Sequence, residues 1–186
     1  LAASLFVFAI SSAYAADKKG KVEKVGGITV LTVGGTPYEM GFQQGSLLKD
    51  DIKTIYDIYL KEKVLKVWVK EYSILGKGGS KAYSNPRGAL LEFAKKSEKY
   101  IPAELVEEMK GLADGAGLKY EDVLIMSSHI DYFAVLCSTF VARGAATKDG
   151  KLIEGRNLDW AQGGLKELDK YAAVIVFKPD AGLPFV

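Results

Sequence analysis

The order of apolar and polar positions predicts a strand followed by a helix near the start of the chain. Residues 25–35 read VGGITVLTVGG, and the β-branched run between the two glycine pairs predicts a strand over Ile28–Val33. Thr36, Pro37 and Glu39 then stand where a capping box places an N-cap, a first helical residue and an N3 carboxylate. Apolar residues spaced by three or four continue to Tyr72, which predicts helix to that point with a possible break near Lys49.

Three further helices follow a glycine-rich linker at 75–88, which reads LGKGGSKAYSNPRG. The apolar spacing predicts helices over Ala89–Tyr100, from Pro102 to the glycines Gly115 and Gly117, and over Tyr120–Tyr132. These apolar faces are typical of a hydrophobic core. The chain before Cys137 is therefore expected to be mostly helical.

The spacing of apolar residues no longer follows a helical period after Tyr132. Residues 137–160 read CSTFVARGAATKDGKLIEGRNLDW, which predicts two strands joined by a turn at Thr147–Gly150. Cys137 opens the first strand, and Arg156 and Asp159 stand at the far end of the returning strand. An antiparallel register would bring all three together, because the two ends of a hairpin meet.

Cys137 is the only cysteine of the chain. Its thiol could be a small buried hydrophobic group, half of an intermolecular disulfide, or a nucleophile. It cannot form a disulfide within the chain, so stability must come from packing. The hairpin pattern alone leaves the three possibilities open, with Arg156 and Asp159 as either catalytic partners or an ordinary surface ion pair.

The segment 1–15 resembles a secretory signal peptide, since a short apolar run ends in Ala13-Tyr14-Ala15. This run is shorter than the roughly 20 residues of a membrane span. We therefore expect a secreted or periplasmic protein without a membrane span, and a sequence that is a fragment at both ends.

Composition narrows the possible partners. The chain has 186 residues, 48% of them hydrophobic, and a net charge of +2, so it lacks the basic surface that nucleic-acid binding requires. Its glycine-rich stretches lack the context of a nucleotide site. No His/Cys cluster suggests zinc, and the aspartates lack the spacing of a calcium loop. We therefore expect neither a cofactor nor a metal.

The hairpin sequence, with the upstream stretches GTPYEMGFQQG and IPAELVEEMKGLADGAGLKYEDVL, resembles the acyl-coenzyme A:6-aminopenicillanic acid acyltransferase-like family. These autoproteolytic N-terminal-nucleophile (Ntn) cysteine hydrolases are related to penicillin V acylase and bile salt hydrolase. The resemblance covers about 34–177 and implies an α+β fold, the four-layer αββα sandwich, of which this chain would hold only the N-terminal portion.

The resemblance also implies a mechanism. Cleavage between Leu136 and Cys137 would make Cys137 a new N-terminus whose α-amino group acts as its base. Asp159 would hold that amino group, and Arg156 would stabilise the thiolate and orient the substrate. The chain would then divide into a signal peptide at 1–15, a leader subunit at 16–136 and the start of the nucleophile-bearing subunit at 137–186. The expected partners are a small amide or acyl substrate and the cleaved leader.

Two other functions fit the residues. The first is a cysteine–histidine hydrolase that uses Cys137 with His129, the only histidine, although a lone helical histidine is commonly a satisfied core residue. The second is a secreted binding module without enzymatic activity, in which the thiol is merely buried.

Overall fold

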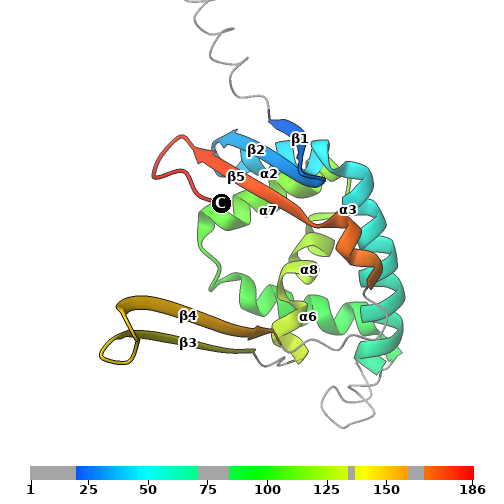
Figure 1. The fold of residues 1–186 in the computed structure, drawn as a ribbon. Helices are drawn as coiled ribbons and strands as arrows, with labels where there is room; N and C mark the ends of the chain where they lie inside the picture. Colours follow the sequence, from blue (N-terminus) through cyan, green and yellow to red (C-terminus); the bar gives the residue numbers. More distant parts are fainter. Residues whose placement is uncertain (1–19, 71–83, 134–136, 159–165) are drawn as a thin grey trace, which may run out of the picture.

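A computed structural model describes residues 20–70, 84–133, 137–158 and 166–186. The chain is a mixed α+β protein in which a small sheet and a helical group are joined side by side, while a separate hairpin extends from the helical end (Figure 1). The mixed α+β class agrees with the sequence-based expectation. No helix among the described residues is long and apolar enough to cross a membrane.

The sheet has the strand order β1-β2-β5. β1 (Lys21–Val25) and β2 (Ile28–Gly35) form an antiparallel hairpin, and β5 (Ala173–Pro179) pairs parallel to β2 with Leu31 opposite Ile175. One face of the sheet buries Leu31 and Val33 against Met40 of the following helix. Strands from near the two ends of the chain are therefore joined in one sheet.

The predicted capping box is present at the start of α2 (Pro37–Leu47). The Thr36 side chain accepts a hydrogen bond from the Glu39 amide at 3.3 Å, and the Thr36 amide donates to the Glu39 carboxylate at 2.7 Å. The predicted break near Lys49 is also confirmed, because Leu48 separates α2 from α3 (Lys49–Ile55). The helical run continues as a π-helix, η1 (Tyr56–Trp68). The predicted end at Tyr72 lies outside the described residues.

The helical group consists of η1, α6 (Pro86–Glu98), α7 (Ala103–Ala116) and α8 (Tyr120–Phe133). Its core contains fully buried residues from three of these helices: Leu60, Val64, Leu90, Leu124 and Ile125. A polar contact joins the same helices, because Asp122 accepts hydrogen bonds from Arg87 at 2.7 Å and from Tyr56 at 3.1 Å. Such a buried carboxylate is tolerated because both of its oxygens have partners.

Two expectations need correction. Helix α6 begins at Pro86 and not at Ala89, because the Asn85 side chain caps the Gly88 amide at 3.0 Å and a proline suits the first helical position. The expected linker at 75–88 is thus shorter at its C-terminal end, and its part 75–83 lies outside the described residues. The pattern also missed β1, which pairs with β2 through a turn at Gly26 and Gly27, both with positive φ. The proposed signal peptide at 1–15 lies outside the described residues.

Candidate active site

The predicted hairpin around Cys137 is confirmed. β3 (Cys137–Gly144) and β4 (Gly150–Leu158) pair antiparallel, with Cys137 opposite Leu158 and Thr139 opposite Arg156. The connection runs over 145–149, so the turn is longer than the predicted Thr147–Gly150. Cys137 therefore begins one strand at the open end of the hairpin, where the other strand finishes.

The closed end of the hairpin is held by local hydrogen bonds. The Thr147 hydroxyl lies 2.9 Å from the carbonyl oxygen of Lys151, and the Lys151 amide donates to Asp149 at 3.2 Å. Gly144 and Gly150 flank the turn with φ values of +60° and +75°, a conformation that favours glycine. These contacts fix the register, and through it the pairing at the Cys137 end.

The register also decides which positions share a face. Residues directly opposite one another in an antiparallel pair project to the same side, as do alternate residues of one strand. Positions 137, 139, 156 and 158 therefore belong to one face, with Arg156 diagonal to Cys137. Diagonal neighbours lie roughly 7–8 Å apart, within reach of a long side chain. The Arg156 side chain is exposed.

Two of the expected residues lie outside the described residues. Leu136 directly precedes β3, and Asp159 directly follows β4. The structure thus brings the backbones of Cys137 and Arg156 together, and Asp159 follows in sequence the residue paired with Cys137.

The opposite face of the hairpin carries Phe140, whose ring covers Gly155 so closely that a Cβ atom on Gly155 would stand 2.5 Å from the ring Cζ. Phe140 is nevertheless 61% exposed, and Leu152 on the other face is 67% exposed. Both faces of the ribbon therefore present large apolar side chains that the described residues leave uncovered. An isolated two-stranded hairpin is marginal in water.

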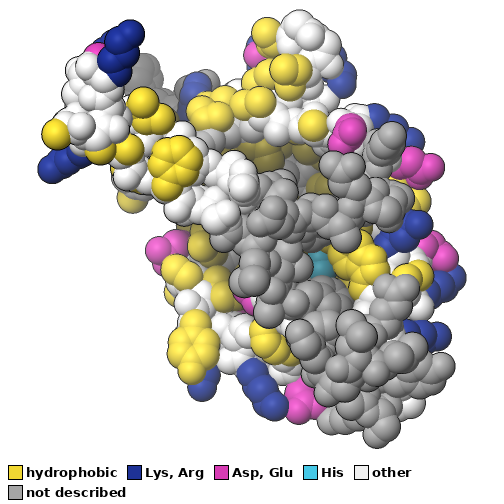
Figure 2. Space-filling view, turned by 60° about the horizontal axis from the view of Figure 1, so that its bottom comes forward, with side chains coloured by type: hydrophobic (Ala, Val, Ile, Leu, Met, Phe, Trp, Pro, Cys, Tyr) yellow, Lys and Arg dark blue, Asp and Glu magenta, His cyan; other side chains and the backbone are white. Residues whose placement is uncertain are grey.

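His129 lies in the helical core and is only 3% exposed. Its Nδ1 lies 2.8 Å from the Met126 carbonyl oxygen and its Nε2 lies 2.6 Å from the Tyr59 hydroxyl. Because a carbonyl can only accept, Nδ1 carries the proton, and Nε2 accepts from Tyr59. Burial lowers the pKa of His129 below its usual value. Figure 2 shows only a small area of the imidazole, in cyan, at the surface beside hydrophobic side chains.

This environment is that of a satisfied core histidine. Both ring nitrogens are engaged within the helical group, one by η1 and the other by its own helix, and the Tyr59 ring packs edge-on against the imidazole with centroids 5.3 Å apart. A general base must instead present a nitrogen to the proton that it removes. The geometry therefore gives no support to the cysteine–histidine mechanism.

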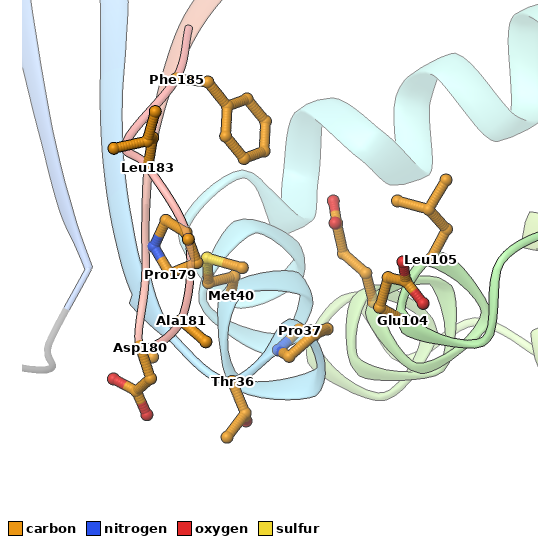
Figure 3. A pocket seen from close by; sticks show the side chains of 13 residues that line it. Thr36, Pro37, Met40, Glu104, Leu105, Pro179, Asp180, Ala181, Leu183 and Phe185 are labelled. Carbon is orange, nitrogen blue, oxygen red and sulfur yellow. The ribbon is translucent and has the colours of Figure 1, made fainter.

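A cavity beside Glu108 was not predicted from the sequence. Glu108 of α7 is half-buried, and burial raises the pKa of its carboxyl group. It lines a cavity of about 530 Å³ between α7, the start of α2 and the segment after β5 (Figure 3). In the sequence Glu108 is one of several glutamates in an amphipathic helix, so no local pattern marks it. Among the described residues, no group of three or more His, Cys, Asp or Glu could hold a metal ion.

Comparison with known proteins finds relatives that match most of this chain. The chain is 30% identical to protein dcd1A of Dictyostelium discoideum over an alignment of 178 positions, gaps included, that covers 87% of this chain and 39% of that protein. It is 30% identical to an uncharacterized protein of Archaeoglobus fulgidus over an alignment of 196 positions, gaps included, that covers 91% of this chain and 30% of that protein.

A shorter match is to an N-acylethanolamine-hydrolyzing acid amidase of Caenorhabditis elegans. It is 33% identical over an alignment of 75 positions, gaps included, that covers 36% of this chain and 20% of the amidase. No family model matches the chain. The chain thus spans well under half the length of the curated relatives that it matches.

Proposed function

We propose that this chain is the N-terminal part of a self-processing cysteine amidohydrolase or acyltransferase. It would act on a linear, non-peptide amide bond through a thioester at Cys137, after cleavage of the Leu136–Cys137 bond. The partial likeness to an amidase supports amide chemistry, and the resemblance to the Ntn cysteine hydrolases supports the self-processing step.

One observation carries the assignment of Cys137. The sole cysteine stands at the first position of a strand, at the open end of a hairpin, with Arg156 on the same face two positions along the partner strand. A cysteine at the start of a strand can become an N-terminus without any loss of ladder pairing downstream. A guanidinium nearby would favour the thiolate over the thiol.

Maturation follows from the chemistry of the thiol. The Cys137 sulfur attacks the carbonyl carbon of Leu136, the carbon–nitrogen bond breaks, and the thiol proton passes to the freed nitrogen. Water then hydrolyses the resulting thioester, which leaves a carboxylate on Leu136 and restores the thiol. The new α-amino group has an ordinary pKa of about 7.7–8.0, close to the thiol value of about 8.5, so it can exchange a proton with its own side chain near neutral pH.

Turnover uses the same groups on an external amide. The sulfur attacks the amide carbon, the α-ammonium group gives its proton to the leaving amine, and the acyl group stays on sulfur as a thioester. Water gives hydrolysis, and a second amine gives acyl transfer. In this proposal Asp159 positions the α-amino group, and Arg156 stabilises the thiolate and orients the substrate.

The proposal extends to fold and location. The four-layer αββα sandwich would cover the exposed apolar residues on both faces of the β3–β4 hairpin, such as Phe140 and Leu152. The leader at 16–136 would remain bound as a subunit after cleavage. The apolar segment at 1–15 supports export to the periplasm or outside the cell.

The test is the intact mass of the full-length gene product and of two variants. The wild-type protein should yield two polypeptides that meet at Leu136/Cys137. Cys137→Ala should stay a single chain and lose amide hydrolysis, because one sulfur serves both steps. Ser138→Ala, one residue further on the opposite face, is the matched control and should mature normally. Amide hydrolysis by purified Cys137→Ala would rule the proposal out.

A further inference from the structure

The cavity beside Glu108 has mainly apolar walls. It lies where β2 passes into α2, and it is bounded by the first turns of α7 and by residues 179–185 (Figure 3). Met40, Leu105, Leu183 and Phe185 contribute apolar side chains. Phe185 is held in place because its backbone pairs with that of Phe177 and the two rings stack with centroids 4.7 Å apart. At about 530 Å³ the cavity falls within the range of small-molecule sites.

Glu108 gives this apolar cavity its charge. Glu108 lines this cavity and two neighbouring ones of about 600 and 330 Å³, so the residue lies where three cavities along α7 meet. Its pKa is raised by burial, and no residue in the described part of the chain offers it a hydrogen bond or an ion pair. No described buried side-chain oxygen lacks a partner, so the Glu108 oxygens reach solvent in the open part of the cavity. A cationic donor entering the cavity would replace water as the partner of this carboxylate.

The remaining charge in the cavity has the same sign. Its lining residues include Glu104 and Asp180 but neither lysine nor arginine among the described residues, and the Asp180 carboxylate points away from the cavity (Figure 3). An anionic ligand would be repelled. A bare metal ion would lack the set of oxygen ligands that it prefers, because the other walls are apolar. The complementary ligand is an organic cation with a hydrophobic part.

We propose that this cavity binds a hydrophobic amine in its ammonium form. The ammonium group donates hydrogen bonds to the Glu108 carboxylate, and the alkyl or aryl part of the ligand lies against Met40, Leu105 and Phe185. A charge-assisted hydrogen bond out of bulk water is stronger than a neutral one, so the carboxylate fixes the orientation while the apolar walls supply most of the affinity. This inference does not depend on the proposed chemistry at Cys137.

The test measures binding of n-octylammonium to the purified protein by titration calorimetry, with neutral 1-octanol and anionic octanoate as probes of equal chain length. Wild-type protein should bind octylammonium most tightly and octanoate least. Glu108→Gln should weaken octylammonium binding at least tenfold while 1-octanol binding stays within about twofold. Glu107→Gln is the matched control, because that neighbouring side chain is 50% exposed and pairs with Lys110 at the surface.

The site of binding is located by amide chemical shifts. Addition of octylammonium should move the resonances of Leu105 and Ala181, which line the cavity from two separate segments. Equal octylammonium affinity in wild type and Glu108→Gln, tighter binding of 1-octanol than of octylammonium, or no binding at millimolar concentration would each overturn the proposal. Because Cys137→Ala leaves this cavity intact, octylammonium should bind that variant normally even if the proposed catalytic function is wrong.

Discussion

Gly41 of α2 lies so close to α7 that a Cβ atom on Gly41 would stand 2.9 Å from the backbone nitrogen of Leu112. The contact is reciprocal, because a Cβ atom on Gly111 of α7 would stand 2.8 Å from a backbone nitrogen of α2. Gly45 and Gly115 repeat the arrangement one turn further along. Glycines at the same spacing on each helix thus let the two backbones touch.

This contact predicts that a glycine-to-alanine change in the helix lowers the free energy of unfolding, whereas such a change usually raises it. Elsewhere in a helix, alanine would be favoured over glycine by roughly 0.5–1 kcal/mol. Gly41→Ala should instead destabilise the protein by about 1–3 kcal/mol or more, because the methyl group meets backbone atoms that cannot move aside. Chemical denaturation measures the difference, with Glu107→Ala on the exposed face of α7 as the control. An unchanged or raised unfolding free energy in Gly41→Ala would contradict the close packing.

The same glycines show what a sequence can and cannot reveal. The family resemblance was supported by the stretches GTPYEMGFQQG and MKGLADGAG. Their physical role is a contact between two helices, and it arises only because these two segments, distant in sequence, lie together in the fold. Local signals such as the capping box at Thr36 and Glu39 and the hairpin at Cys137 could be predicted because their partners are near in sequence. The parallel pairing of β2 with β5 could not, since no short-range pattern specifies it.

In the candidate site, too, contacts between residues near in sequence could be predicted, and contacts that depend on helix packing could not. The pairing of β3 with β4, which makes Cys137 and Arg156 diagonal neighbours, follows from hairpin periodicity and was predicted from the sequence. The burial of His129 against Tyr59 and the position of Glu108 among three cavities depend on helix packing, which periodicity does not specify. Periodicity likewise predicts only a continuous helix where the structure has the π-helix that carries Tyr59.

The burial of His129 predicts a pH-dependent stability. Its pKa is lower in the folded protein than the ordinary value of about 6.5, so the unfolded chain binds the extra proton more readily. Stability from this residue is therefore complete above about pH 6.5 and declines as pH falls toward the lowered pKa of the folded state. Urea unfolding at several pH values should show this decline in wild type, and His129→Gln should lose part of it. The same slope in both proteins would mean that other groups cause it.

His129 also distinguishes between two catalytic mechanisms. If the α-amino group of Cys137 is the base, His129→Gln should leave single-turnover acylation of the processed protein within a few-fold of wild type. Tyr59→Phe is the matched control, because it removes the hydrogen-bond partner of Nε2 but keeps the imidazole. A loss of several orders of magnitude in His129→Gln alone, with folding and processing preserved, would show that the histidine is the base.

Asp159 and Arg156 are expected to act in catalysis and not as a surface ion pair. An exposed pair contributes roughly 0–1 kcal/mol to stability, so loss of either residue would then change little. If Asp159 positions the new α-amino group, Asp159→Asn should keep the melting temperature close to wild type while turnover falls on the order of 100-fold or more.

Arg156→Lys should also lose activity, because a point ammonium cannot reproduce the planar guanidinium fork. Arg143→Lys, in the same hairpin but at its closed end, should retain normal turnover. Turnover of a short-chain acyl amide is measured on the processed proteins, and near-normal rates in both Asp159→Asn and Arg156→Lys would remove these residues from the site and leave Cys137 alone.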